Sequence, residues 1–363
     1  MKQICLIGGK LQGFEAAYHA RKAGIGVVLI DRNENAFIKD LVDTFHCFDI
    51  VEQPERLIEI SATVDAMIPV NENFDTIDFL ETIKEKLQCP LLFDFDAYRI
   101  SRDKNTSKKY FRSIGIPTPT DKPTHPPYFI KPSCMSSSIG TAIIYDDEGL
   151  KGLDPTMLIE EYVEGDVLSL EVVGDGEHFA VVKETKVHID DTYDCHMVTP
   201  VSHNPELRRI TYELARDLKL KGIMDVEAID SPQGLKVLEI DARFPSQTPT
   251  AVYHSSGINL LELLMQAFTE GVQEMAQAPE GNYCIYEHLI LKDGKLSPIG
   301  EHILSMGNNY RPIHGSEGVE IFQRDGEYKA FTVITWGEDQ EKAEMNRKRA
   351  HEMILRIPER EMA

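Results

Sequence analysis

Four acidic side chains in two neighbouring segments have a spacing that could bind a cation. They are Asp225, Glu227, Glu239 and Asp241. If the two segments form a β-hairpin, Glu227 faces Glu239 and Asp225 faces Asp241. Because side chains alternate along a strand, all four acids then share one face. The sequence therefore predicts a compact group of carboxylate oxygens.

The turn between the two segments sets this register. We expect strands over 222–230 and 235–243, and Pro232 suits the first corner of a type I turn. Gly234 suits the left-handed residue that closes a three-residue loop. A slip of one residue would place the paired glutamates on opposite faces, so the prediction depends on this loop. The other face of the hairpin is apolar, with Met224, Val226, Ala228, Leu238, Ile240 and Ala242.

A bound metal ion would explain why the acids stand together. Like charges directly opposite each other destabilise a sheet, and no Lys or Arg shares that face within the paired stretch. A divalent cation would reconcile the arrangement, and oxygen-only ligands favour a hard ion such as Mg2+. The alternative is an acidic, solvated face on an edge hairpin, although such faces usually carry interspersed lysines.

Length and composition indicate a multidomain globular protein that acts on small molecules. The 363 residues predict two or three domains, and the formal net charge is 38 − 60 = −22. Nucleic acid is a poor candidate partner because phosphate backbones require a basic surface, whereas an acidic chain attracts Mg2+ and diamino acids. The six cysteines contain no Cys-x-x-Cys pair, so we expect reduced thiols. Without a membrane-spanning run or a signal peptide, we expect a cytoplasmic protein.

The order of secondary-structure patterns predicts three segments. Residues 1–84 alternate strands and helices, which predicts a small parallel sheet with helices on both faces. Residues 85–269 begin with a charged helix and a Pro-rich connector and then become β-rich, and 270–363 form a small β-rich part that ends in a charged helix from Asp339. The expected helices span 14–23, 54–61, 96–114, 206–218 and 257–268.

A glycine-rich turn near the N-terminus resembles a phosphate-binding motif. Gly8-Gly-Lys-Leu-Gln-Gly13 links a strand to a helix, and Asp31 ends the next strand. Backbone N–H groups at such a helix start can hold a phosphate or a carboxylate, and the acid can bind ribose. Because the glycines fall as G-G-x-x-x-G and not G-x-G-x-x-G, a nicotinamide oxidoreductase is only a rival hypothesis. Whether Lys10 and Asp31 hold a second nucleotide stays open.

Two further segments could hold a nucleotide. Lys131 stands late in an apolar strand, and the small-residue loop 133–140 after it could fold over phosphates and exclude water. The backbone of the strand 158–163 could read an adenine edge, and Glu160 could accept a hydrogen bond from the amine or from ribose. Each segment has a plainer interpretation, an ordinary hairpin in one case and an acidic strand edge in the other.

In this order the segments resemble the ATP-grasp superfamily of carboxylate–amine ligases. The order is a βαβ region, a lysine, a second lysine with a Ser/Gly loop, a Glu-Glu-x-Val hinge, and D-x-E followed by E-x-D-x-R on the hairpin. A closer resemblance, to the ATP-grasp ligases of pyrrolysine biosynthesis, covers nearly the whole chain. It runs through residues 8–18, 69–73, 193–200 and 239–250.

The resemblance implies an α/β fold with ATP-grasp architecture, and it assigns a role to each of the three segments. Residues 1–84 would be an N-terminal Rossmann-like domain, 85–269 an ATP-grasp domain with a lid, and 270–363 a small C-terminal domain. The implied cofactors are ATP and Mg2+, and the implied partners are small-molecule substrates. Oligomeric state is left open.

The resemblance also implies nucleotide and metal ligands at matching positions. Lys104 and Lys131 would contact the phosphates, with Ser138 on the loop. Many relatives carry Asn at 241, and a ribose-binding Glu where this chain has Val167; ribose recognition could therefore fall to Asp166. The adenine site would be Glu160, Glu161, Tyr162 and Val163, and the metal ligands would be Glu227, Glu239 and Asp241.

The implied reaction joins two amino acids at the expense of ATP. Phosphoryl transfer to the α-carboxylate of (3R)-3-methyl-D-ornithine would give an acyl phosphate, and the ε-amine of L-lysine would attack it, releasing phosphate. Lys131 and Arg243 would be the catalytic cations, with Arg243 anchoring the reacting carboxylate. A ligase for another carboxylate–amine pair is the alternative.

A diamino-acid substrate requires acids for its ammonium groups and a cation for its carboxylate. We expect Leu11, Gln12 and Glu72 to receive the lysine, because they stand at a helix start and a strand end, where α/β sites gather. Glu301 is expected from the resemblance only. The remaining candidate substrate residues are Ser169, Leu170, Glu171, Asp225, Arg243, Phe244, Pro245, Ser246, Gln247 and Thr248. His196 is tempting as a base, but a lone loop histidine is more often structural.

Overall fold

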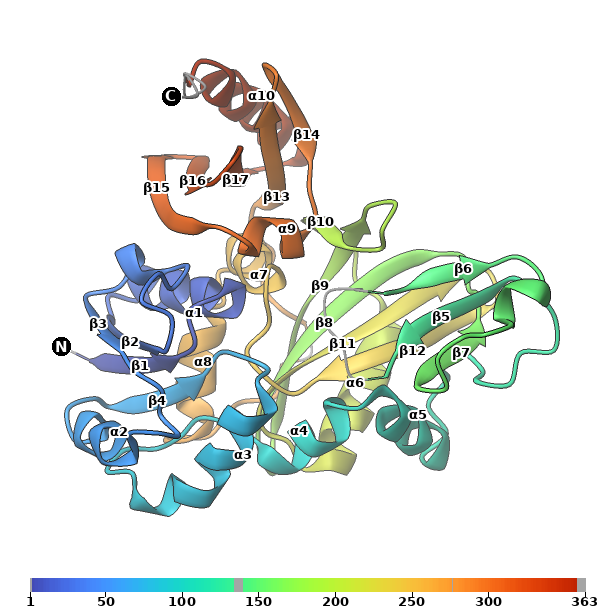
Figure 1. Ribbon diagram of the computed structural model, residues 1–363, viewed down its shortest axis with the longest axis horizontal. Helices are drawn as coiled ribbons and strands as arrows, with labels where there is room; N and C mark the ends of the chain where they lie inside the picture. The colour runs from blue at the N-terminus through green and yellow to red at the C-terminus, as the bar shows by residue number, and fades with distance from the viewer. Residues whose placement is uncertain (1, 134–139, 276, 358–363) are drawn as a thin grey trace.

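The computed structural model describes residues 2–133, 140–275 and 277–357 and arranges them around three β-sheets (Figure 1). The first is a four-stranded parallel sheet in the order β3-β2-β1-β4. Its strands are β1 (Gln3–Ile7), β2 (Gly26–Asp31), β3 (Thr44–Cys47) and β4 (Ala66–Pro69). The helices that pack on it include α1 (Leu11–Lys22), α2 (Pro54–Ser61) and α3 (Phe74–Ile83).

Alternation along β1 explains why helices cover both faces of this sheet. Ile4 packs in a core with Phe14 of α1, whereas the next residue, Cys5, packs in another core with Leu57 of α2 and Leu80 of α3. Side chains of neighbouring strand residues point to opposite faces, so each face has its own apolar cluster. The predicted strand–helix alternation of this region is confirmed.

The largest sheet is antiparallel and joins the middle of the chain to its C-terminal part. Its order is β12-β11-β8-β9-β10-β13-β17-β16-β15, with β14 beside β13. The strands expected after residue 282 are thus hydrogen-bonded, through β10 and β13, to the sheet that carries the acids. The strands are β8 (Asp166–Asp175), β9 (Phe179–Ile189), β10 (Cys195–Pro200), β11 (Lys221–Ser231), β12 (Gly234–Asp241), β13 (Tyr283–Lys292), β14 (Lys295–Pro298), β15 (Asn308–Ser316), β16 (Val319–Asp325) and β17 (Lys329–Gly337).

A small third sheet lies beside the β12 end of the large one (Figure 1). It has the order β6-β5-β7, with β5 (Tyr128–Pro132), β6 (Ala142–Ile144) and β7 (Met157–Glu161). The two sheets are connected by the ion pair between Glu161 of β7 and Lys236 of β12, at 2.5 Å. This sheet carries the predicted lysine and hinge segments.

The remaining helices surround the large sheet. No helix within the described ranges is both long enough and apolar enough to cross a membrane. The helices are α4 (Phe95–Ser101), α5 (Lys104–Ser113), α6 (Pro205–Leu218), α7 (Thr248–Ser256), α8 (Leu260–Ala267), α9 (Glu301–Ser305) and α10 (Gln340–Leu355), with short 3-10 turns at Lys39–Leu41, Lys84–Lys86 and Glu148–Leu150.

Three helix predictions were wrong in their bounds. The helix expected over 14–23 begins three residues earlier, at Leu11, and side-chain caps explain the other two. The helix expected over 96–114 is divided into α4 and α5 because Asp103 accepts a hydrogen bond from the first turn of α5 and starts a new helix. The helix expected over 257–268 begins only at Leu260, where Asn259 is the cap. Gly257, with a φ of 76°, ends α7, a helix that the sequence analysis missed.

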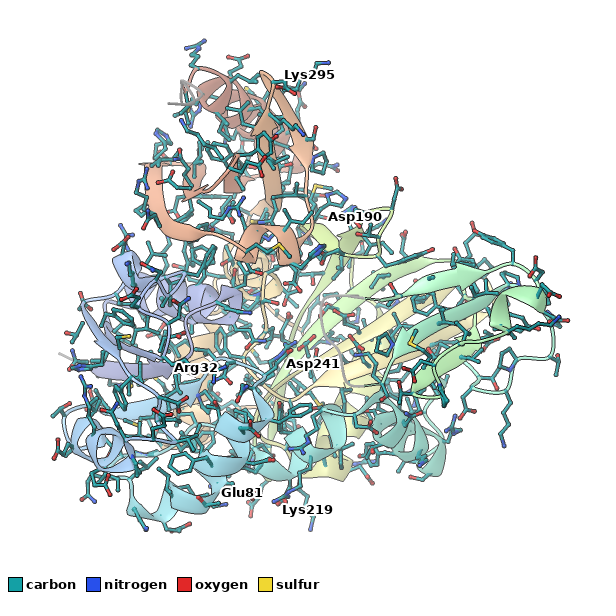
Figure 2. All side chains as sticks on the ribbon, in the orientation of Figure 1. Arg32, Glu81, Asp190, Lys219, Asp241 and Lys295 are labelled. Atoms are coloured by element: carbon teal, nitrogen blue, oxygen red, sulfur yellow. The ribbon has the colours of Figure 1, made fainter. Side chains whose placement is uncertain are left out.

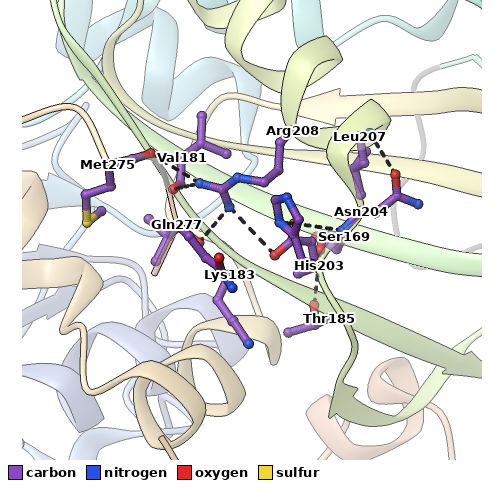
Figure 3. Close-up of polar contacts among 12 residues, drawn as sticks. Ser169, Val181, Lys183, Thr185, His203, Asn204, Leu207, Arg208, Met275 and Gln277 are labelled. Atoms are coloured by element: carbon purple, nitrogen blue, oxygen red, sulfur yellow. Dashed lines mark hydrogen bonds and ion pairs between the residues drawn. The ribbon is translucent and has the colours of Figure 1, made fainter. Parts of the chain in front are cut away.

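A buried network anchors α6 to the large sheet (Figure 3). Arg208 donates hydrogen bonds to the carbonyl oxygens of Val182, Val181 and Met275 at 3.0, 2.7 and 3.3 Å. Its guanidinium also lies 3.6 Å from the buried carboxylate of Glu184. One side chain therefore holds together the helix, β9 and the segment that follows α8.

Replacing Arg208 with Ala should lower the free energy of unfolding by about 3–5 kcal/mol. It leaves three backbone carbonyls without this donor and removes the guanidinium beside the buried Glu184 carboxylate, which keeps only His203 and the Asn204 N–H. The neighbouring Arg209→Ala is the control. The Arg209 guanidinium is half exposed and pairs with Glu213 at 2.8 Å, so its loss should cost less than about 1 kcal/mol. Urea denaturation measures both. Equal costs would contradict the anchoring role.

Candidate active site

Strands β11 and β12 place the four acids in the two pairs that the sequence predicts. Asp225 is opposite Asp241, and Glu227 is opposite Glu239. All four side chains therefore lie on one face of the hairpin. In Figure 2, Asp241 lies near the centre of the molecule, between the N-terminal sheet and the large sheet.

The predicted three-residue loop is wrong, although the acid pairs that it was used to derive are present. Ser231 pairs with Gly234, so the loop has two residues, and Ala228 pairs with Val237. A β-bulge between Glu227 and Ala228 then shifts the register by one residue and restores the acid pairs. Leu238, the extra residue, was predicted on the apolar face.

The bulge exchanges the positions of two apolar side chains. Val237 is fully buried in the core of the hairpin's apolar face. Leu238 instead lines a cavity together with Glu227 and Glu239. A bulge beside a site re-aims a side chain in this way, and here it supplies an apolar wall next to the acids.

Two adjoining cavities meet at the hairpin. The larger one, of about 830 Å³, lies between the carboxyl ends of the N-terminal strands and the acid face. The smaller one, of about 200 Å³, lies between the hairpin and the small sheet. Residues that line both cavities mark their junction, and they are Lys104, Val167, Ile189, Tyr193, Glu227 and Glu239.

Arg243 draws together carboxylates from three parts of the chain. Its guanidinium lies 2.7 Å from Glu72, 2.8 Å from Asp241 and 3.5 Å from Asp225. Lys104, at the start of α5, lies 2.9 Å from Glu239. These cations reduce the repulsion that the facing acids would otherwise produce.

The acids have very different affinities for protons. Burial, and then the charges of Glu239 and Asp241, raise the pKa of Glu227 to about 8. Burial also raises the pKa of Asp241 to about 6, against the lowering effect of Arg243. For Glu239, burial is outweighed by Lys104 and Lys131, which lower its pKa to about 2. Burial, and then the charge of Asp241, raise the pKa of Asp225 well above its ordinary value. The group therefore lacks positive charge around Asp225 and Glu227.

The donor set suits a metal ion that is shared with a substrate. No three His, Cys, Asp or Glu side chains in the described part of the chain are grouped so as to hold a metal by themselves. Mg2+ usually takes one or two carboxylates and fills its remaining positions with water and substrate phosphates. Facing glutamates at 227 and 239, with the raised pKa of Glu227, fit that kind of site.

The small cavity is lined by Lys104 and Lys131, the two lysines predicted to contact the phosphates of the nucleotide. Lys131 is buried, and its ammonium lies 3.3 Å from the carboxylate of Glu160, which also contacts the ammonium of Lys108. Burial lowers the pKa of Lys131 to about 8 and that of Lys108 to about 6. Lys108 was missed in the sequence analysis, although it stands one helical turn after Lys104.

The hinge positions line the small cavity, but their acids are already paired. The Glu160 carboxylate holds the two lysines, and Glu161 pairs with Lys236. Tyr162 and Val163 also line this cavity. Val167 lines both cavities, while Asp166 pairs with Lys186 at 2.6 Å and lines neither. Ser138 lies outside the described residues.

The large cavity contains most of the predicted substrate residues. Gln12 donates a hydrogen bond to Glu72 at 3.0 Å, and Glu301 accepts from Ser246 and Gln247 at 3.1 and 3.0 Å. The other predicted residues on its wall are Lys10, Leu11, Asp31, Asp225, Arg243, Pro245 and Thr248.

Several predicted residues lie away from both cavities. Ser169, Leu170, Glu171 and Phe244 are buried and line neither. Glu171 is opposite Asp225 on the neighbouring strand, and burial raises its pKa to about 7. Their roles stay predictions.

The backbone of Gly9 explains the position of Asp31. The N–H of Gly9 donates to the Asp31 carboxylate at 2.8 Å. This hydrogen bond joins the glycine-rich turn to the end of β2, so Asp31 supports the turn whether or not a nucleotide binds there.

The chain is similar to known ATP-dependent enzymes. Residues 101–247 match the model of the ATP-grasp domain. The 3-methyl-D-ornithine–L-lysine ligase of Methanosarcina acetivorans is 63% identical over 357 residues, which cover 98% of each chain. The ligase of the same name from Methanosarcina barkeri is 63% identical over 342 residues, which cover 94% of each chain.

Solved structures share the fold at low sequence identity. Biotin carboxylase of Campylobacter jejuni superposes with a TM-score of 0.72 at 15% identity, covering 96% of this chain and 90% of the other. N5-carboxyaminoimidazole ribonucleotide synthetase of Thermotoga maritima gives a TM-score of 0.70 at 19% identity, with coverage of 97% and 98%.

Replacing Arg243 with Ala should destabilise the protein in a pH-dependent manner. Without the guanidinium, Asp225 and Asp241 lose the charge that lowers their pKa, and their folded-state pKa values rise further above the unfolded ones. Stability from such groups is present at low pH and is lost as pH rises. The deficit should therefore be larger at about pH 8 than at about pH 5.5, reaching about 3–5 kcal/mol.

Denaturation at the two pH values measures this deficit. Arg102→Ala is the control, because Arg102 borders the same cavity but pairs with the exposed Asp78. Its deficit should stay below about 1 kcal/mol at both pH values. A deficit for Arg243→Ala that does not change with pH would contradict the electrostatic explanation.

Proposed function

This chain belongs to the 3-methyl-D-ornithine–L-lysine ligases, a family of ATP-grasp enzymes, and we propose that it performs their reaction in pyrrolysine biosynthesis. It is an ATP-dependent ligase that forms a C–N bond. In the proposed reaction, the α-carboxylate of (3R)-3-methyl-D-ornithine is joined to the ε-amine of L-lysine. The products are 3-methyl-D-ornithyl-N6-L-lysine, ADP and phosphate.

The observation that carries this proposal is the junction of the two cavities at Lys104, Glu227 and Glu239. A ligase of this kind must bring a terminal phosphate to a carboxylate. The small cavity, with Lys131 and the hinge, would hold ATP. The large cavity, with acids from both sheets, would hold the two amino acids, whose ammonium groups require carboxylate partners.

The first step is phosphoryl transfer at the junction. An oxygen of the diamino acid's carboxylate attacks the γ-phosphorus of ATP, and the bond to the β-phosphate oxygen breaks to release ADP. Lys104 and Lys131 would stabilise the transferring group, and Arg243 would orient the carboxylate. Positioning and charge supply most of the catalysis in such a step.

A metal ion would complete this arrangement. ATP-grasp enzymes typically use Mg2+ with ATP, and Glu227, Glu239 and Asp241 are the residues that would hold it. When bound, Mg2+ neutralises phosphate charge and orients the phosphates. Lys104 pairs with Glu239 at 2.9 Å in the protein alone, so an incoming cation would free its ammonium for a phosphate.

The second step forms the amide in the large cavity. The neutral ε-amine of lysine attacks the carbonyl carbon of the acyl phosphate, the C–O bond to the phosphate breaks, and the nitrogen loses a proton. Leu11, Gln12 and Glu72 would position the lysine, since they line the cavity on the side of the N-terminal sheet. Glu301, at the start of α9, would be a further substrate-binding residue on the wall of the large cavity.

Each of the three predicted segments would have a role of its own in this reaction. We propose that residues 1–84 receive the amine substrate, that 85–269 bind ATP and the metal, and that 270–363 complete the wall of the large cavity. The partners are small molecules, as expected of a ligase with these relatives.

The purified protein should convert ATP, 3-methyl-D-ornithine and L-lysine into the isopeptide, ADP and phosphate when Mg2+ is present. Mass spectrometry identifies the isopeptide, and a coupled assay measures ADP. Removal of Mg2+ with a chelator should stop turnover. The alternative is a ligase for another carboxylate–amine pair, and equal turnover with unrelated acids and amines would favour it.

Glu239→Gln should lower the rate of isopeptide formation at least about 100-fold, because it removes the carboxylate that faces Glu227 and pairs with Lys104. ATP should still bind through the hinge, which can be measured by calorimetry. The matched control is Asp230→Asn, an exposed acid on the paired strand β11, which should leave the rate unchanged. Full activity of Glu239→Gln would contradict the proposed metal site.

A further inference from the structure

A short turn between β9 and β10 stands at the junction of the two cavities. Tyr193 lines both cavities, and so does Ile189 at the end of β9. The next residues, Asp194 and Cys195, line the large cavity. In Figure 2, Asp190, the first residue of the turn, lies at the end of β9 and β10, beside the C-terminal part of the chain. The turn therefore borders the place where an acyl phosphate would form.

Local hydrogen bonds hold this turn in one conformation. The Asp190 carboxylate accepts from the N–H of Thr192 at 2.7 Å and of Asp194 at 3.1 Å. Tyr193 has a φ of 64°, a left-handed conformation that is costly for a bulky side chain. Such strain persists only where the surroundings fix it.

The anchor of the turn is helix α9. The carboxylate of Asp194 is buried, contacts the imidazole Nδ1 of His302 and accepts from the His302 N–H at 3.2 Å. Gly300 is close enough that a side-chain carbon at this position would collide with the same carboxylate. The turn and the start of α9 thus fit together without spare room.

The same helix holds the opposite wall of the large cavity. Glu301, next to His302, accepts hydrogen bonds from Ser246 and Gln247. Gln247 is itself left-handed, with a φ of 71°, and is buried. Helix α9 therefore contacts the turn of Tyr193 through His302, and it contacts the segment that follows Arg243 through Glu301.

Tyr193 also contacts the small sheet. Its ring packs against Phe129 with the ring centroids 5.3 Å apart and the planes at 81°. Phe129 is two residues before Lys131 and lines the small cavity. The aromatic pair thus connects the turn to the small sheet, next to Lys131.

We propose that Asp194 and His302 are positioning residues that hold Tyr193 over the junction, so that the acyl phosphate meets the lysine amine before it meets water. This inference rests on the proposed function, because it requires that intermediate. Neither residue has to touch the reacting atoms. Their effect is on the conformation of the turn, and through Glu301 on the opposite wall.

The proposal predicts a specific defect. If water enters, its oxygen attacks the carbonyl carbon of the acyl phosphate, the C–O bond to phosphate breaks, and the diamino acid is regenerated with loss of a proton. ATP is then consumed without formation of the amide. The measurable quantity is the ratio of ADP to isopeptide formed in the same reaction, which a loss of folded enzyme alone does not change.

The test compares this ratio in the full-length protein and in variants. His302→Ala removes the partner of Asp194 and should raise the ratio from near one to about two or more. His302→Asn keeps a donor near the Nδ1 position and should restore much of the coupling. Tyr193→Ala leaves the anchor intact and should reproduce the defect, so a His302 variant that folds poorly does not decide the outcome.

The matched control is His351→Ala. His351 likewise contacts a buried acid, Glu287, at 2.6 Å, but neither residue lines either of the two cavities described above. Its ratio should stay near one. A ratio near one in His302→Ala and Tyr193→Ala, or an equal rise in the control, would overturn the positioning role. If the unaltered protein forms no isopeptide, the proposed function fails instead.

Discussion

The mutual repulsion of four carboxylates on one hairpin face is the constraint on which the site depends. Strand pairing sets Asp225 opposite Asp241 and Glu227 opposite Glu239, and Lys236, which the bulge places opposite Ile229 on that face, pairs with Glu161 instead. Neutralising charge must therefore come from elsewhere. Lys104 and Lys131 provide it from α5 and β5, and Arg243 provides it from the residues that follow β12. The arrangement of the acids therefore depends on how the segments that carry these cations pack against the hairpin.

A continuous antiparallel sheet connects the acids of the hairpin to the C-terminal part of the chain. Because β10 pairs with β13, the C-terminal strands extend the sheet that carries the acids and bring α9 to the cavity wall. The N-terminal sheet approaches from the other side and contributes Glu72 to Arg243. Each large segment of the chain therefore supplies part of the wall around one junction. Amino acids with several charged groups require partners on all sides, and this arrangement provides them.

The sequence predicted the chemistry of the site better than its local geometry. Alternation along two short strands was enough to place the acids on one face, because that periodicity is fixed by the backbone. The loop and the bulge could not be derived, since a two-residue loop with a bulge and a three-residue loop give the same acid pairs and differ only in the residues between the bulge and the loop, among them Val237 and Leu238. Lys108 and Tyr193 were missed for another reason. Their roles arise from contacts between segments far apart in the chain, with Glu160 and Phe129.

The negative net charge of the chain is a reason for a divalent cation to accompany ATP. A net charge of −22 opposes the approach of ATP, which is itself an anion, while it favours diamino acids. Burial lowers the pKa of Lys131, which lines the small cavity, and that of Lys108, which pairs with Glu160 beside it. Further lysines there would repel one another and lose their protons. A divalent ion bound together with the nucleotide would supply positive charge beside Asp225 and Glu227, the acids whose pKa values are raised most.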